Sequence, residues 1–362
     1  MKRKELTALF FVGLMISGIV AAAATEAGAS GDPFISLEWL NKTFIPNAVE
    51  SANNLVDQRF DDLTDELLSS GTVGTELRVK RGDVLQSETG THVMMMAGDV
   101  SISSTGSVVD MTAGEELTSG ATCIANHRYL VAEKTTASFT VMSDTAVIRF
   151  AGSYEFTPSA ETDYNALADA LKAMGLFQGS TTAYGSGYDL ENAPTRMEGL
   201  IMFLRLMGKE DTALAFSGES VTFADVPNWA AAYAAYAYNQ GYTKGQGLDS
   251  QGNVVFGSFS QLSAKDYMTF LLRALSYQEG IDFNWSTAIS DAKTLGVITK
   301  GEESLLTEKP FLRSQVVYLS YFSLSAKARG EEVTLLNRLI AAKCVNAVTA
   351  QSAMHGLDLQ RL

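Results

Sequence analysis

The residue types that most often perform catalytic or metal chemistry are sparse in this sequence. Its 362 residues include three histidines, His92, His127 and His355, and two cysteines, Cys123 and Cys344. No two histidines lie at the spacing of a zinc site. Neither a Gly-x-Ser-x-Gly nucleophile elbow nor a paired-carboxylate motif stands out. We therefore expect a protein that is not an enzyme and that uses no metal or other cofactor.

Metal chemistry and disulfide bonding are the two remaining possibilities for these residues. A cupin-type metal enzyme needs several histidine and carboxylate ligands around one metal, and the region that would supply them holds only His92 and His127. Cys123 and Cys344 fall in regions with different sequence patterns, so we expect two isolated, inert thiols rather than a disulfide framework.

The N-terminus has the pattern of a signal peptide. Lys2, Arg3 and Lys4 precede an apolar run over residues 6–20 and small residues up to 24. This run is shorter than the roughly 20 residues of a membrane-spanning helix. We expect residues 1–24 to be removed, with cleavage after Ala24 or Ala29, and the mature protein to be secreted to the cell surface. An uncleaved N-terminal anchor is the alternative.

The chain is acidic, with 41 Asp and Glu against 27 Lys and Arg and a formal net charge of −14. An acidic surface repels nucleic acid and anionic lipid. We therefore expect neither nucleic acid nor, once the signal peptide is removed, a membrane among the partners.

Residues 33–70 have the pattern of an amphipathic helical segment, divided by Pro46. Its apolar positions repeat every eleven residues, which keeps one stripe on one face of a nearly straight helix. The stripe must be buried, either on the chain's own next domain or by self-association into a helical bundle.

Residues 75–157 are typical of an all-β domain, because apolar and polar residues alternate and glycines recur at strand-length intervals. The pair Gly82 and Asp83 recurs as Gly98 and Asp99, which suggests two equivalent turns. A sandwich, a jelly roll and a small barrel all fit this pattern.

Residues 163–345 are predicted to hold three helical repeats, about 163–208, 222–277 and 283–329, followed by a closing helix. In each repeat an aromatic residue opens a helix that ends at a glycine, and a second helix, apolar nearly all round, follows. Such apolar helices are expected to be buried together. The tail beyond residue 350 is expected to be loosely held.

These repeats resemble the S-layer homology family of bacterial surface proteins. The middle repeat opens with Phe223, Asp225, Val226 and Trp229, close to the family's opening motif. Its Thr-Arg-Ala-Glu motif is approximated by residues 195–198 in the first repeat. The resemblance covers about residues 163–330. The second repeat has Ala264 at the motif arginine, the third lacks the threonine and the glutamate, and the first lacks the opening motif.

The resemblance implies a pseudo-threefold helical module that binds secondary cell-wall polysaccharide, attached to peptidoglycan, in grooves between the repeats. Guanidinium groups bind carboxylates through two parallel hydrogen bonds, and an aromatic ring offers a sugar an apolar face. The acids at the motif position could instead cap the buried helices. The glycan-binding residues implied in this way are Arg196, Arg313, Trp229, Trp285, Glu198, Asp225 and Asp266.

Two functions are thus expected from the sequence. The first is a non-catalytic surface protein anchored to the cell wall by the helical repeats, whose N-terminal helix and β-domain mediate assembly. The alternative is an envelope protein whose β-domain binds a ligand and whose helical module is only a scaffold.

Overall fold

In the computed structural model, the residues that the structure describes are 45–47, 49–50, 52–53, 74–179, 188–218, 221–308, 310–355, 357 and 361–362. The chain divides into two compact units, Met1–Phe60 and Asp61–Leu362. The described residues of the first unit are helical. The expected signal peptide and most of the predicted helix over 33–70 lie outside the described residues.

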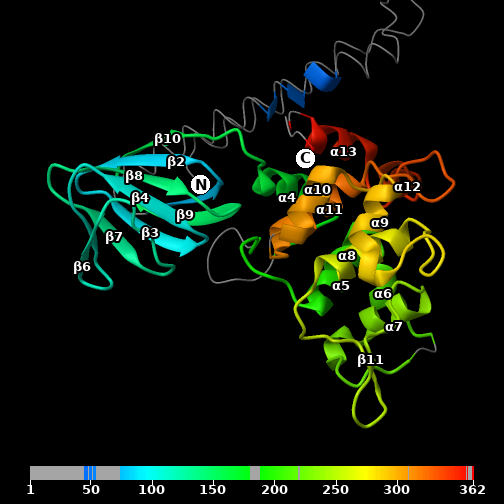
Figure 1. Cartoon of the computed structure of the whole chain (residues 1–362). Coiled ribbons are helices and arrows are strands. Elements are labelled where there is room, and N and C mark those ends of the chain that lie inside the picture. Colours follow the sequence, from blue (N-terminus) through cyan, green and yellow to red (C-terminus); the bar gives the residue numbers. More distant parts are fainter. Residues whose placement is uncertain are drawn as a thin grey trace, which may run out of the picture. The chain divides into compact units, whose positions relative to one another are not determined.

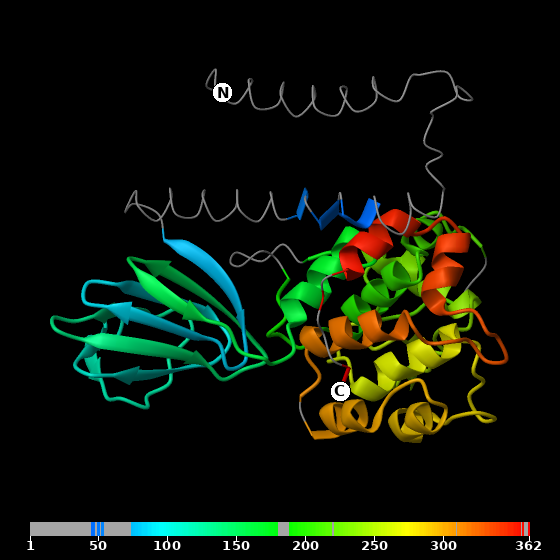
Figure 2. The ribbon, with the colours of Figure 1, turned by 90° about the horizontal axis from the view of Figure 1, so that it is seen from above.

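The β-domain consists of two antiparallel sheets (Figures 1 and 2). One has the order β1-β9-β3-β7-β5-β6 and the other β10-β2-β8-β4, so most consecutive strands alternate between the sheets, as they do in jelly rolls. The strands are β1 (Thr75–Lys80), β2 (Val84–Glu88), β3 (His92–Ala97), β4 (Val100–Ser104), β5 (Val108–Asp110), β6 (Glu115–Leu117), β7 (Arg128–Val131), β8 (Thr136–Val141), β9 (Thr145–Ala151) and β10 (Tyr154–Thr157). The prediction of an all-β domain over residues 75–157 is confirmed.

One apolar core joins the two sheets. Buried residues alternate with more exposed ones along β8, as expected for a strand with one face on a core. Phe139 of β8 and Phe150 of β9, from different sheets, pack edge to face with ring centroids 5.7 Å apart. Cys123 belongs to this core, and burial raises the pKa of its thiol to about 12, so it is an inert free cysteine.

The recurring glycine-aspartate pairs mark two turns, one before β2 and one before β4. Gly98 has a φ of 85°, and a Cβ atom there would lie 2.5 Å from the carbonyl oxygen of Thr145. Only glycine fits at this turn.

The C-terminal region is mostly helical, as predicted. The second helices of the three predicted repeats are α5, α8 and α11. Contacts link α5 to both α8 and α11, and the Tyr267 hydroxyl of α8 lies 2.7 Å from the Ser320 hydroxyl of α11. The elements are α4 (Tyr164–Ala173), α5 (Arg196–Leu206), α6 (Glu210–Leu214), η2 (Asn228–Ala230), α7 (Ala231–Asn239), β11 (Gly247–Leu248), β12 (Val254–Val255), α8 (Ala264–Ala274), η3 (Trp285–Thr287), α9 (Ala288–Thr294), α10 (Lys300–Glu308), α11 (Arg313–Ser323), α12 (Leu335–Ala341) and α13 (Ala347–Met354).

Local signals in the sequence explain where these helices begin and end. The hydroxyls of Thr195 and Ser263 accept hydrogen bonds from the third residues of α5 and α8, and the side chains of those residues accept in return. The first helices end at Gly175, Gly241 and Gly296, which have φ values of 74°, 72° and 73°.

The tail beyond residue 350 differs from the prediction. Helix α13 continues to Met354 and packs beside α4 (Figure 2). The Arg361 guanidinium donates to both carboxylate oxygens of the fully buried Glu302, at 2.7 and 2.9 Å. Packing on α4 holds α13, and the pairing of Arg361 with a buried carboxylate holds the last residues.

Candidate ligand-binding groove

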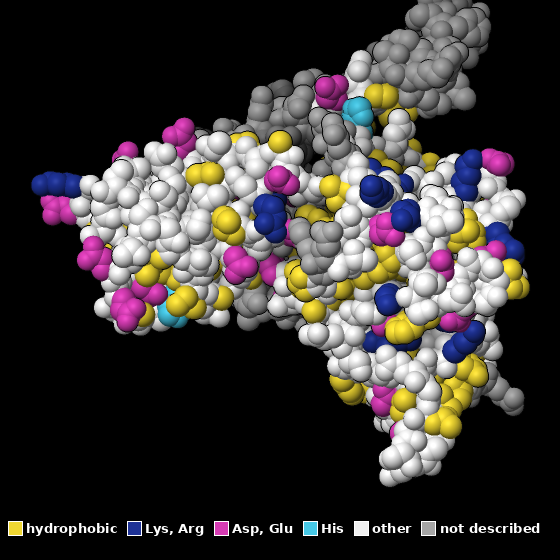
Figure 3. All heavy atoms as spheres, viewed as in Figure 1, with side chains coloured by type: hydrophobic (Ala, Val, Ile, Leu, Met, Phe, Trp, Pro, Cys, Tyr) yellow, Lys and Arg dark blue, Asp and Glu magenta, His cyan; other side chains and the backbone are white. Residues whose placement is uncertain are grey.

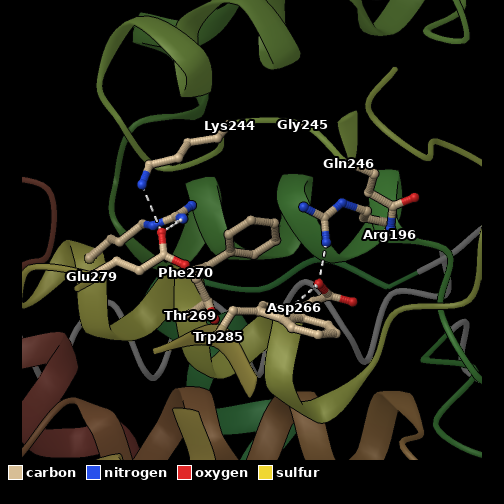
Figure 4. Close-up of a pocket in the computed structure, with 10 residues that line it drawn as sticks. Arg196, Lys244, Gly245, Gln246, Asp266, Thr269, Phe270, Glu279 and Trp285 are labelled. Atoms are coloured by element: carbon tan, nitrogen blue, oxygen red, sulfur yellow. Dashed lines mark hydrogen bonds and ion pairs between the residues drawn. The ribbon is translucent and has the colours of Figure 1, made fainter. Parts of the chain in front are cut away.

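A groove with a cavity volume of about 500 Å³ brings together residues from all three predicted repeats. Figure 4 shows Arg196 from the first repeat, Asp266 and Phe270 from the second, and Trp285 from the third around one space. The lining residues are Arg196, Lys244, Gly245, Gln246, Asp266, Thr269, Phe270, Arg273, Glu279 and Trp285.

Arg196 is the first residue of α5, and its side chain is held from three sides. Its Nη1 donates to Asp266 Oδ1, and its guanidinium carbon lies 5.1 Å from the ring centroid of Phe256 and 5.4 Å from that of Phe270. Arg196 is 5% exposed, yet its Nε makes no hydrogen bond with the described residues. This donor is itself buried, so it is an unpaired group of the interior and not one that the open groove presents.

Asp266 connects the arginine, the helix start and the tryptophan. One carboxylate oxygen accepts from Arg196 and, at 3.1 Å, from Trp285 Nε1; the other accepts from the Ser263 hydroxyl at 2.7 Å. Burial opposes ionisation of this carboxyl, but Arg196 and the other donors outweigh it and hold its pKa below the ordinary value. Asp266 is therefore ionised at neutral pH.

A second ion cluster lies across the ring of Phe270 from the first (Figure 4). Glu279 accepts from Lys244 at 2.8 Å and from Arg273 at 2.7 Å. Burial opposes ionisation of Glu279, but the two cations hold its pKa below the ordinary value. Because one carboxylate faces two cations, this end of the groove has an excess positive charge, and Lys244, at 69% exposure, can reach a ligand.

The two predicted tryptophans differ in their surroundings. Trp285 lines the groove, with its side chain half exposed and Lys265 Nζ 5.6 Å from its ring. Trp229 is 64% exposed and does not line the groove. Of the two, Trp285 alone could contact a ligand bound in this groove.

Asp225 and Glu198 lie outside the groove and stabilise local structure. Asp225 accepts three backbone hydrogen bonds, from Phe256, Gly257 and Ser258, at 2.6 to 2.7 Å. Burial opposes ionisation of Asp225, but these donors hold its pKa below the ordinary value. Glu198 accepts from the backbone nitrogen and the hydroxyl of Thr195, which is the capping role weighed for it from the sequence.

Arg313 also lies away from the groove. It is the first residue of α11 and, at 5% exposure, is as buried as Arg196. Its Nε donates to the Tyr188 carbonyl at 3.1 Å, and no ion pair joins it to the described residues. Burial lowers its pKa, an effect that the more distant Glu198 and Asp189 oppose.

Several groove residues were not predicted from the sequence. Lys244 lies in the glycine-bounded turn of the second repeat, and Phe270 in its apolar helix, where both patterns also have purely structural explanations. No sequence pattern marked Arg273 and Glu279 as binding residues, because an arginine near a helix end and a glutamate six residues later are common. Their pairing depends on how the chain folds back after α8.

The described residues contain neither a membrane-spanning helix nor a metal-binding cluster. None of their helices is long and apolar enough to cross a membrane. No cluster of three or more His, Cys, Asp or Glu side chains among them could hold a metal ion.

Comparisons with known proteins add little. No family model matches the sequence, and no curated protein matches it. Among solved structures, the crystal structure of the coconut allergen cocosin is similar over 28% of this chain, with 9% identity and a TM-score of 0.16. This chain spans 34% of the cocosin chain. A similarity this weak carries no argument about fold or function.

Proposed function

We propose that this protein is a non-catalytic, exported surface protein that binds an anionic secondary cell-wall polysaccharide through the groove around Arg196 and Trp285. The observation that supports this proposal is the convergence of three residues from three separate repeats: Arg196, Asp266 and Trp285 meet in one groove. Each was selected from the sequence by its position in an S-layer homology motif.

The chemistry of the groove suits a glycan that carries carboxylates. The half-exposed ring of Trp285 can lie against the apolar face of a sugar. Lys244 and the Arg196 guanidinium, which both line the groove, can bind acidic substituents on either side of Phe270. Asp266 and Glu279 fix the cations in place before the ligand arrives, which reduces the ordering cost of binding.

We further propose that the three repeats form a pseudo-threefold module. Its support is local: in α5, α8 and α11 the third residue, Glu198, Asp266 or Gln315, accepts a hydrogen bond from the backbone nitrogen before the helix. The third repeat departs chemically, because Gln315 also donates to Asp144 of the β-domain at 2.9 Å. Self-association through the N-terminal helix and the β-domain remains part of the proposal.

The test is co-sedimentation of the full chain with Gram-positive cell-wall sacculi, before and after the secondary polymer is stripped. We expect binding that disappears on stripping and weakens with salt, because the attraction is partly between charges. Trp285→Ala and Lys244→Ala should each weaken binding about tenfold.

Trp229→Ala is the matched control, since it removes an exposed tryptophan outside the groove. If untreated sacculi fail to sediment the chain, or if Trp285→Ala binds as well as the unsubstituted chain does, the anchoring proposal is wrong. The search for function would then move to the β-domain.

A further inference from the structure

The outer face of the six-stranded sheet holds a cavity that the proposed function does not use. Its volume is about 410 Å³, and its lining includes His92 and Met94 of β3, Arg128 of β7 and Arg149 of β9. Val93, Tyr129 and Phe150 lie in the core between the sheets, so their neighbours along each strand point the other way, into this cavity.

Strand register fixes the spacing of the cationic groups. Met94 pairs with Arg128 on one side and with Arg149 on the other. The two arginine Cα atoms are therefore two strand spacings apart, about 10 Å, with Met94 as the apolar floor between them. His92 follows on the same face of β3, about 7 Å from Met94.

This concentration of basic groups stands out against the charge of the domain. Residues 75–157 contain ten acidic and six basic residues, together with two histidines. Two of those six basic residues and one of the two histidines line this single cavity. Like charges placed together repel one another and destabilise the fold, and a bound anion would reduce this repulsion.

The two arginines differ in their hydrogen-bond partners. Arg149 is anchored by Glu76 at 3.0 Å, which leaves most of its five N–H donors unused. The Arg128 side chain is exposed and makes no hydrogen bond or ion pair with the described residues. At one end of the cavity, a Cβ atom on Gly74 would lie 2.9 Å from Arg149 Cγ, so the backbone closes this end without a side chain.

We propose that this cavity binds a small organic oxyanion whose carboxylate or phosphate groups are held by Arg128 and Arg149. Planar guanidinium groups match the oxygens of both anions with two parallel hydrogen bonds. The uncharged part of the ligand lies over Met94 and Ala151, and His92 adds a further hydrogen bond.

The test is calorimetric titration of the full chain with citrate and, separately, with inorganic phosphate, at low salt. Binding of citrate alone assigns the site to carboxylates, and binding of phosphate alone assigns it to phosphates. Arg128→Gln should weaken binding about tenfold, and the double variant with Arg149→Gln should abolish it. Lys134→Gln is the matched control, because Lys134 is an exposed cation of the same domain outside the cavity.

Arg128→Gln removes an exposed side chain that makes no hydrogen bond or ion pair with the described residues, so its melting temperature should equal that of the unsubstituted chain and the result will report on binding. Failure of both anions to bind at millimolar concentration overturns the proposal. Equal binding by the unsubstituted chain and Arg128→Gln also overturns it.

Discussion

Arg196 and Arg313 occupy the same position, the first residue of a buried helix, and are equally buried, yet their charges are compensated differently. Arg196 has a carboxylate partner and two aromatic rings around it. Arg313 donates to one backbone carbonyl and has no ion pair with the described residues. The acids that cap α8 and α5 also differ: Asp266 caps α8 and still reaches Arg196, whereas Glu198 bonds only to Thr195 among the described residues.

The same motif position therefore places an arginine in two different surroundings. Arg196 forms an ion pair and lines a groove. Arg313 is buried in the interior, where it donates to a backbone carbonyl. Substitutions at the two positions should therefore have different consequences.

The largest difference is expected for replacement of each arginine by methionine. Arg196→Met leaves the Asp266 carboxylate buried without its cation, which should lower the free energy of unfolding by about 3–5 kcal/mol. Arg313→Met strands no described carboxylate but leaves the Tyr188 carbonyl without its donor, so the loss should be smaller, about 1–3 kcal/mol. Denaturant unfolding followed by tryptophan fluorescence measures both, and equal losses would refute the distinction drawn here.

A smaller difference is expected in the acid range. The pKa of Asp266 is lower in the folded protein than its ordinary value, so the stability it contributes is fully present above that ordinary value, near pH 4. This contribution is lost as the pH falls through the lower folded pKa, at about 1.4 kcal/mol for each unit between the two values.

Asp266→Asn should therefore differ most from the unsubstituted chain at neutral pH, and the two stability curves should converge below about pH 4. Arg313→Met is the control, because a guanidinium stays charged throughout this range and its effect should be independent of pH. Unfolding measured between neutral and acid pH gives both curves, and a constant Asp266→Asn difference would contradict the pairing with Arg196.

The smallest effect concerns the two tryptophans. Trp285→Phe keeps an aromatic ring but removes the hydrogen bond to Asp266, which should cost about 1 kcal/mol at this half-exposed site. Trp229→Phe removes no described hydrogen bond and should change stability by less than about 0.5 kcal/mol. Thermal unfolding of both variants would rank them, and the reverse order would contradict a stabilising hydrogen bond from Trp285 to Asp266.

The sequence predicted the local elements better than the contacts between them. Alternation along β8 and the glycines at 175, 241 and 296 correctly indicated strands and helix ends, because these signals act over a few residues. Arg196 and Asp266 were both selected, but their pairing joins residues 70 positions apart and depends on the packing of α5 against α8. No local pattern encodes that packing.

Other features escaped prediction for related reasons. The β11–β12 hairpin has only two residues in each strand, too few for an alternating pattern. The docking of Arg361 depends on Glu302, which lies 59 positions earlier in the chain. The cationic cavity of the β-domain requires the strand order β9-β3-β7, which only the folded sheet provides.

The three hydrogen bonds that Asp225 accepts have a mechanical consequence. They fix the backbone at Phe256, Gly257 and Ser258, directly after the β11–β12 hairpin, and the ring of Phe256 packs against the Arg196 guanidinium. These bonds hold the end of β12 beside Arg196, while β11 follows directly on Gln246, which lines the groove. Only the turn between the two strands, residues 249–253, is separated from both Gln246 and Phe256, so it is the part of the hairpin where a change in length should disturb the groove least.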